Sequence, residues 1–368
     1  MTTFADIGRG NFNGDAESAG DLILFNNFGD KAIWLEDGNG GRLATSPNGF
    51  NLPFTGPTWH IVAATDFDGG GGGKTLVPLG GTNPFFASDL LWQNDNGDLA
   101  LWQSNGSNVN PFPGNENQAN LGNPGAGWHV ASTNDFDGNG AADILFQNVA
   151  GNLAIWEFQT FNPVNILQGA PVIKPGGQLN VDQNPGATWH VVATGDINQD
   201  DKAGIVFQNS DTNGIAVWEN PTQVGGQIHF NIQSNLPNPG PEWHVVGMGN
   251  TTEPEIGPPG EDLVLQNDNG NIAIWQLTIV GGQVVRDNAG GTDPTGFNLG
   301  NPGPGWHVVA VRDMNNDTRA DLLLQNDNGA AAVWDNIQQT PGTSNGTHDG
   351  FNFNPQPNPP GVNEWHIA

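Results

Sequence analysis

Hydrophobic and polar positions alternate in short runs along the chain. In NIAIW, residues 271–275, Ile272 and Ile274 fall on one face and Ala273 and Trp275 on the other. This period of two residues is typical of β-strands. The preceding run, DLVLQ, is separated from NIAIW by Asn-Asp-Asn-Gly, which is a tight-turn signal for a hairpin. Helical periodicity is absent throughout, so the pattern predicts an all-β protein.

The same hairpin recurs six times, at intervals of about 60 residues. The aligned segments, each ending in Trp, are 21–34, 89–102, 143–156, 204–218, 262–275 and 321–334. A Trp-His pair recurs between them, at 59–60, 128–129, 189–190, 243–244, 306–307 and 365–366. Such self-similarity predicts a repeat architecture, here a six-bladed β-propeller of four-stranded antiparallel blades.

One domain is expected over residues 1–368, closed into a ring by strands from both ends of the chain. Aligning Asn11 with Asp196 places Phe4 where Trp189 stands, so the N-terminal inner strand is degenerate. We expect the C-terminal residues 365–368 to join the first blade beside residues 5–12. The alternative is a truncated array whose tail begins a seventh blade. The predicted blade boundaries are 1–58 with 365–368, 59–127, 128–188, 189–242, 243–305 and 306–364.

The repeat resembles the VCBS and FG-GAP group of bacterial propeller repeats. The motif is most complete at residues 127–156, GWHVASTNDFDGNGAADILFQNVAGNLAIW. The resemblance implies a propeller fold, and the group includes adhesins, integrin heads, sugar-binding lectins and enzyme appendages. Because one fold serves many functions, the resemblance indicates the fold more strongly than the function.

Acidic loops between the first two strands of the repeat predict calcium sites. The loop at 135–143 offers side-chain oxygens at its first, third, fifth and ninth positions, and the loop at 313–321 keeps the same four positions. Oxygen ligands in a tight loop suit Ca²⁺, a hard cation that takes six to eight of them. The predicted ligands are Asp135, Asp137, Asn139, Asp143, Asp313, Asn315, Asp317 and Asp321. The alternative is a polar turn held by Asx hydrogen bonds.

The other loops match this pattern less well. Asp196, Asn198 and Asp200 keep the first half of the loop, but Gly204 replaces the closing Asp, which predicts weak binding. The first blade has Asn11, Asn13 and Asp15 followed by an insertion, and the second has Asp66 and Asp68 before a glycine run. The fifth blade lacks the loop. Even where calcium binds, we expect its role to be structural.

Ligand-binding candidates lie at the other end of each blade, where Trp-His begins the inner strand and Gln-Asn ends the next. An aromatic ring beside amide groups suits sugar binding, since the ring stacks on a pyranose and the amides bind hydroxyls. The candidates are Trp59, His60, Trp128, His129, Trp189, His190, Trp243, His244, Trp306, His307, Gln93, Asn94, Gln147, Asn148, Gln208, Asn209, Gln266, Asn267, Gln325 and Asn326. The alternative is structural: the Trp residues pack between blades and the Gln-Asn pairs cap the hairpin turns.

The charge composition of the chain limits the classes of molecule that it is expected to bind. The formal net charge is −29, with nine Lys and Arg against 38 Asp and Glu, so nucleic acid and anionic membranes are poor partners. The sequence contains no run of 18 apolar residues, so no membrane-spanning segment is predicted. The chain has no Cys, which leaves its redox compartment open. We expect an extracellular or cell-surface location, although residues 1–10 contain no secretory signal.

Enzymatic activity is not expected. A sialidase needs a Tyr nucleophile and an Arg cluster, whereas this chain has no Tyr and five scattered Arg residues. No blade carries an unusual cluster of acid, base or nucleophile residues. The leading hypothesis is a calcium-stabilised carbohydrate-binding propeller that binds glycans or cell-surface glycoconjugates at repeated weak sites. The alternative is a structural or protein-interaction propeller of a secreted or surface protein, and either would be compatible with a homo-oligomer.

Overall fold

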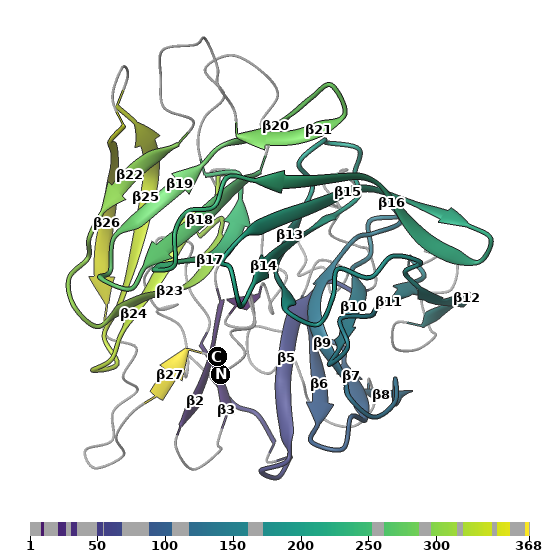
Figure 1. Cartoon of the computed structure of the whole chain (residues 1–368). Helices are drawn as coiled ribbons and strands as arrows, with labels where there is room; N and C mark the ends of the chain where they lie inside the picture. The colour runs from purple at the N-terminus through teal and green to yellow at the C-terminus, as the bar shows by residue number, and fades with distance from the viewer. Residues whose placement is uncertain are drawn as a thin grey trace, which may run out of the picture.

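A computed structural model shows a β-propeller, with sheets that radiate from a common centre (Figure 1). The structure describes residues 9–10, 21–26, 31–34, 50–53, 55–67, 88–104, 118–160, 172–251, 261–286, 296–314, 319–340, 344–353 and 365–367. Within these ranges every regular element is a strand, as the two-residue alternation of the sequence predicts. No helix long and apolar enough to cross a membrane occurs among them.

Five sheets have four antiparallel strands each, ordered along the chain from the centre of the ring outwards. The first two are β5 (Trp59–Thr65), β6 (Asp89–Asn94), β7 (Leu99–Trp102) and β8 (Gln118–Gly122), and β9 (Trp128–Asn134), β10 (Asp143–Asn148), β11 (Leu153–Phe158) and β12 (Ile173–Asn180). The third is β13 (Trp189–Gly195), β14 (Gly204–Asn209), β15 (Ile215–Val224) and β16 (Gln227–Leu236). The last two are β17 (Trp243–Gly249), β18 (Asp262–Asn267), β19 (Ile272–Trp275) and β22 (Phe297–Gly300), and β23 (Trp306–Arg312), β24 (Asp321–Asn326), β25 (Ala331–Gln339) and β26 (Gly346–Phe353).

Another sheet differs from these five because both ends of the chain contribute to it. Its strands are β1 (Arg9–Gly10), β2 (Asp21–Asn26), β3 (Lys31–Trp34), β4 (Phe50–Asn51) and β27 (Trp365–Ile367). β27 pairs with Leu24–Asn26 of β2, and β1 pairs with Asp21 and Leu22. The prediction of six four-stranded blades is therefore wrong: the four-stranded blades number five. This sheet has five strands because two short terminal segments share the edge of β2 that one inner strand would occupy.

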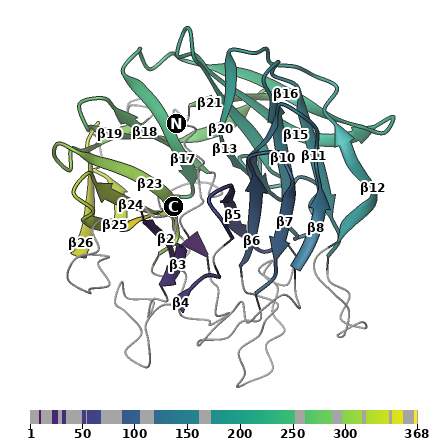
Figure 2. The same cartoon turned by 90° about the horizontal axis from the view of Figure 1, so that it is seen from below.

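The inner strands of neighbouring blades contact each other in chain order, β1 to β5, β9, β13, β17 and β23 (Figures 1 and 2). Most blades carry a bulge at the same place in this strand, for example at Val191/Ala193 and Val245/Gly247. Bulges increase local twist, which suits a strand that turns around a central axis. Because the bulge recurs at the same position, the inner strands of these blades share the same local bend.

Hydrophobic clusters fill the spaces between adjacent blades. One cluster joins Leu91 and Phe67 of one blade to Val130, Ile144 and Phe146 of the next. Trp92, which stands where other repeats have Phe or Leu, is 1% exposed, as its alignment predicts. Among the described residues, each hydrophobic cluster joins two neighbouring blades, so the blades bury their faces against one another.

The outer strands also connect blades. β15 and β16 form a long hairpin, and β16 contacts the two-stranded hairpin of β20 (Leu277–Val280) and β21 (Gln283–Arg286) from the next repeat. Gln183, which follows β12, donates from its side-chain amide to the carbonyl of Phe230 and accepts the N–H of Phe230, and so joins the β9–β12 blade to β16 of the next blade.

Candidate functional site

The predicted acidic loops and the predicted ligand residues lie at opposite ends of each blade. In the β13–β14 pair, Trp189 is opposite Asn209 at one end and Gly195 is opposite Gly204 at the other. The β17–β18 and β23–β24 pairs have the same register. This arrangement confirms the prediction that follows from antiparallel pairing. We call the end with the recurring Trp-His pairs, from Trp59-His60 to Trp306-His307, the Trp-His rim.

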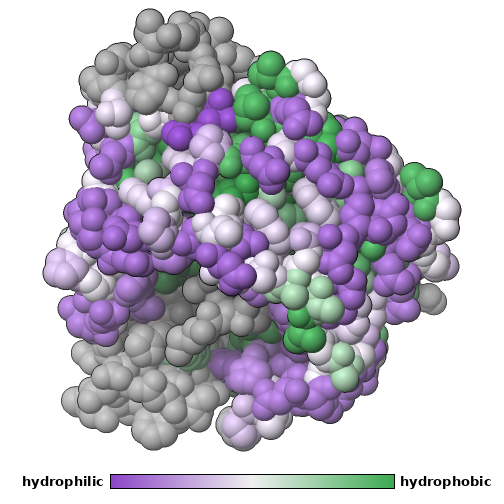
Figure 3. All heavy atoms as spheres, viewed as in Figure 1, coloured by the Kyte–Doolittle hydropathy of each residue, from purple (hydrophilic) through white to green (hydrophobic). Residues whose placement is uncertain are grey.

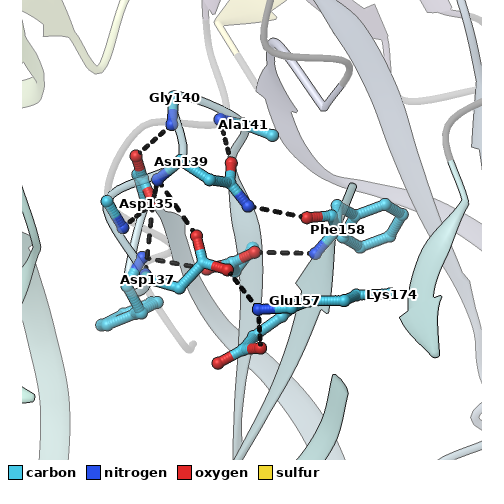
Figure 4. Close-up of polar contacts among 11 residues, drawn as sticks. Asp135, Asp137, Asn139, Gly140, Ala141, Glu157, Phe158 and Lys174 are labelled. Atoms are coloured by element: carbon cyan, nitrogen blue, oxygen red, sulfur yellow. Dashed lines mark hydrogen bonds and ion pairs between the residues drawn. The ribbon is translucent and has the colours of Figure 1, made fainter. Parts of the chain in front are cut away.

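The β9–β10 loop brings three predicted calcium ligands together (Figure 4). Asp135, Asp137 and Asp143 each offer an oxygen, and these oxygens lie within 4.8 Å of one another. Asp135 also accepts hydrogen bonds from the backbone N–H groups of Gly138 (2.7 Å) and Gly140 (2.6 Å), which fold the loop back over the carboxylate.

Asn139, the fourth predicted side-chain ligand in this loop, makes structural contacts. Its amide nitrogen donates to the carbonyl of Phe158 at 2.9 Å, and its oxygen accepts from Ala141 N–H at 2.7 Å. Figure 4 shows the side chain extending from the loop towards β11. The asparagine therefore ties the loop to the third strand of its own blade.

Asp143 is fully buried at the start of β10 and accepts hydrogen bonds from Phe136 N–H (2.9 Å) and Phe158 N–H (2.8 Å). Burial raises its pKa to about 8, against the lowering effect of these two bonds. Burial also raises the pKa of Asp135. Without a bound cation, the low-dielectric surroundings disfavour the charged forms of both groups.

A lysine stands against the outer side of this loop. Lys174 of β12 places its ammonium 2.9 Å from Asp137 Oδ2 and 3.0 Å from Glu157 Oε2 (Figure 4). The two carboxylates raise the pKa of the ammonium above its usual value. No local sequence pattern pairs Lys174 with Asp137, because 37 residues separate them along the chain.

The donor set fits a calcium ion. Three carboxylates converge, and all are hard oxygen donors of the kind that Ca²⁺ prefers. With Glu157 they could carry four negative charges, which a single lysine only partly offsets. The same carboxylates also hold the loop through N–H groups, so the polar-turn alternative accounts for part of the pattern.

A buried carboxylate closes the corresponding loop in all five four-stranded blades. It accepts an N–H from the start of the loop: Phe67 to Asp89, Phe136 to Asp143, Ile197 to Glu219, Thr251 to Asp262 and Met314 to Asp321. Asp262 keeps this role in the blade that lacks the acidic loop. The closing carboxylate therefore has a structural function that needs no metal.

Glu219 explains how the third four-stranded blade retains this closure although Gly204 replaces the closing Asp. A Cβ atom at Gly204 would lie 2.2 Å from Glu219 Oε1, so the glutamate occupies the space of the missing aspartate side chain. Glu219 comes from β15, the strand next to β14. The nearby Asp196 accepts N–H groups of Asp200 and Asp201, while Asn198 donates to Asp200.

In the last acidic loop only part of the predicted set can be placed. Asp313 and Asp321 are described, and Asp321 is buried. Asn315 and Asp317 lie outside the described residues, as do Asn11, Asn13, Asp15 and Asp68 of the partial loops. The prediction of calcium at these positions stays a prediction.

The glutamines of the Trp-His rim fasten adjacent blades. Gln208 donates to the carbonyl of Trp243 at 2.8 Å and accepts from Val245 N–H at 3.0 Å, so both polar atoms bind the backbone of the next blade. Gln147 and Gln266 make the same two bonds, and Gln93 accepts the corresponding N–H of Val130. Gln325 occupies the same register opposite His307. These contacts favour the structural interpretation of the glutamines.

The asparagines that follow them cap the hairpin turns. The side-chain oxygens of Asn94, Asn148, Asn209, Asn267 and Asn326 each accept a backbone N–H two residues ahead. This contact is the Asx turn that the alternative interpretation predicts.

A recurring Asn-Pro-Gly turn, absent before Trp59, precedes the other four Trp residues of the Trp-His rim. In one copy Asn184 accepts from Gly186 N–H at 2.7 Å and donates to Asn152 in the hairpin turn of its blade. Gly186 has φ = 104°, and its carbonyl accepts the N–H of Trp189. The other copies begin at Asn123, Asn238 and Asn301. The sequence signal for this turn is the recurring Asn-Pro-Gly itself, which begins five residues before each of these four Trp residues.

Exposed His–Asp pairs distinguish three of the blades. His60, His244 and His307 place Nε2 2.8, 2.9 and 3.0 Å from Asp95, Asp268 and Asp327. All six side chains are more than half exposed. Val149 and Ser210 stand at the Asp position in the two other blades, so His129 and His190 lack this partner. Burial and the nearby His190 lower the pKa of His129.

The Trp residues of the rim are half-buried. Trp59, Trp128, Trp189, Trp243 and Trp306 each pack against the hydrophobic cluster between two blades and keep part of their surface exposed. The Trp residues at the ends of the third strands, Trp102, Trp156, Trp218 and Trp275, are buried, and Trp334 is half-buried. Trp34 lies in β3, but its side chain is outside the described residues.

The sequence matches no protein-family model and no curated protein.

Proposed function

We propose that this chain is a non-enzymatic, extracellular or cell-surface propeller that binds carbohydrate. The motif at 127–156 supports the proposal that it is a divergent relative of the VCBS and FG-GAP repeats. A propeller fold is compatible with a ligand-binding or protein-interaction module. The observation that carries the carbohydrate proposal is the exposed His–Asp pair beside a half-buried Trp, repeated in three blades.

This combination supplies the contacts that a sugar needs. A carboxylate and an imidazole can bind neighbouring hydroxyl groups, while the exposed part of a Trp ring packs on the apolar face of a pyranose. The excess of acidic residues favours neutral or amino sugars over anionic ones. Three similar sites on one rigid ring would bind a multivalent glycan more tightly than any single site does.

A glycan array with matched variants tests the proposal. Asp95→Asn, Asp268→Asn and Asp327→Asn in one chain should abolish binding, because all three His–Asp pairs lose their carboxylate. His129→Ala with His190→Ala, in the blades without an Asp partner, should leave binding unchanged. Equal signals from the two variants, both folded by circular dichroism, would contradict the assignment of the sites.

We also propose a structural calcium ion in the β9–β10 loop, held by Asp135, Asp137 and Asp143. The ion would neutralise carboxylates whose charged forms are disfavoured by burial. Because the loop and the Trp-His rim lie at opposite blade ends, calcium would act on the stability of the blade. Chelation should therefore lower the melting temperature more directly than it changes glycan specificity.

The second candidate is a protein-interaction propeller, which the outer hairpins favour. Val224 and Val280, 60% and 62% exposed, lie beside the Gly-Gly turns of the β15–β16 and β20–β21 hairpins. Hydrophilic residues predominate among the coloured atoms of the face seen in Figure 3. An array without any binding, together with self-association of the wild-type chain that Val224→Ser and Val280→Ser abolish, would favour this candidate.

A further inference from the structure

The ammonium group of Lys174 lies among the carboxylates around the β9–β10 loop. Lys174 is 42% exposed, but its ammonium contacts two carboxylates that are largely buried, Asp137 (14% exposed) and Glu157 (3% exposed). Asp137 also belongs to the acidic cluster, together with Asp135 and Asp143. The lysine therefore neutralises one of the three carboxylates that would hold a calcium ion.

We propose that Lys174 competes with a divalent cation for Asp137 and so sets the cation affinity of this loop. This inference rests on the proposed calcium site. Asp137 Oδ1 accepts the N–H of Asn139, and Oδ2 accepts the ammonium of Lys174. A divalent ion bound among the three carboxylates would meet a like charge beside one of its ligands. Binding therefore requires Lys174 to withdraw from Asp137, while Glu157 remains available as its partner.

The position of Lys174 within the fold supports a dedicated role. The chain has only four Lys residues and five Arg residues, so few cationic side chains are available to pair with its acidic residues, and this lysine pairs with two of them. Lys174 lies in β12, the outer strand, and β12 pairs with β11, which carries Glu157. Its side chain reaches back over β11 to the loop that precedes β10 (Figure 4).

A second lysine near the loop provides a matched control. Lys202 lies in the next blade, and a Cβ atom at Gly138 would be 3.3 Å from Lys202 Cγ, so its stem packs on the same loop. Lys202→Met changes the net charge by the same amount as Lys174→Met. It does not remove the ammonium that contacts Asp137.

Calcium titration by calorimetry, after removal of divalent ions with EDTA, tests the inference. Lys174→Met should bind Ca²⁺ at least about tenfold tighter than wild type, because the repulsion between a monovalent and a divalent charge a few ångströms apart is removed. Lys202→Met should change the affinity less than threefold, about the size of a screened surface effect. Asp143→Asn should abolish the binding in the Lys174→Met background, which assigns it to this loop.

Folding is controlled separately, because Lys174→Met leaves Glu157 buried without its cation. The double variant Glu157→Gln/Lys174→Met removes that charge as well and should bind Ca²⁺ as tightly as Lys174→Met does. Equal or weaker binding in both lysine variants, while wild type binds, would overturn the competition and leave the calcium site standing. Absence of binding in wild type and in every folded variant would overturn the calcium site, and the competition with it.

Discussion

At the scale of single residues, the most informative position is Glu219. It lies fully buried on β15, and its carboxylate accepts N–H groups of Ile197 and Asn220 at 3.3 Å each. In the other four-stranded blades an Asp at the start of the second strand closes the loop. Here the carboxylate comes from the neighbouring strand, and Gly204 leaves room for it. The two changes are therefore complementary, and Gly204→Asp alone should clash with Glu219.

Buried carboxylates make the stability of the apoprotein depend on pH. Burial raises the pKa of Glu219 and of Asp143 to about 8, above the values of about 4 expected in the unfolded chain. Their contribution to the free energy of unfolding is thus fully present below pH 4 and is lost as the pH rises through 8.

The measurement is a series of thermal melts in EDTA between pH 5 and pH 9. Wild type should lose melting temperature across this range, and Glu219→Gln should lose less, because a neutral amide does not titrate and only the part due to Asp143 is left. Added calcium should reverse the Asp143 part of the loss in both proteins, since Glu219→Gln keeps the calcium loop intact. A pH profile identical in wild type and Glu219→Gln would show that Glu219 does not titrate in this range.

At the scale of elements, the blades are joined by backbone contacts at both ends of their inner strands. At the Trp-His rim, the glutamine side chains bind the backbone of the next blade. At the opposite end, the carbonyls of Asp66, Asp135 and Asn250 accept N–H groups of Ala142, Ala203 and Ala320 in the following blade. These bonds, made by the main chain or by one side chain per repeat, link adjacent sheets at both ends of their inner strands.

Removal of one of these glutamine side chains should measurably lower the free energy of unfolding. Gln208→Leu leaves the carbonyl of Trp243 and the N–H of Val245 without their side-chain partner, which should lower the free energy of unfolding by about 1–3 kcal/mol. Gln223→Leu, at the exposed end of β15, is the matched control and should change it by less than about 0.5 kcal/mol. Urea denaturation measures both, and similar values for the two variants would argue against the inter-blade role.

Local patterns predicted these elements better than they predicted the contacts between them. The strands and hairpin turns follow from alternation and from Asn-Gly signals within each repeat, as at 262–275. The bonds from Gln208 to Trp243, from Lys174 to Asp137 and from Glu219 to Ile197 join residues 35, 37 and 22 positions apart. A single sequence gives no register for such distances, so the glutamines were predicted as ligand groups and Lys174 and Glu219 were missed.

At the scale of the whole molecule, ring closure depends on the pairing between β2 and β27. Leu24, Phe25 and Asn26 pair with Ile367, His366 and Trp365. The recurrence of Trp-His at the C-terminus predicted this pairing, because the first repeat lacks its own copy. The prediction that both chain ends contribute strands to the first blade agrees with the pairing of β1 and β27 to β2, whereas the predicted number of four strands in that sheet is wrong.

The absence of Cys allows a direct test of closure, because an engineered pair has no competing thiol. Phe25 and His366 are directly opposite in the β2–β27 ladder, a placement compatible with a disulfide. Phe25→Cys/His366→Cys should oxidise within one chain and stabilise the fold by about 2–4 kcal/mol, since the crosslink restricts the unfolded state. Non-reducing gels and melts with and without reductant measure this, with Phe25→Cys alone as the control. Crosslinks that form only between chains would mean that β27 comes from a second copy, and failure to oxidise would mean that the ring is open.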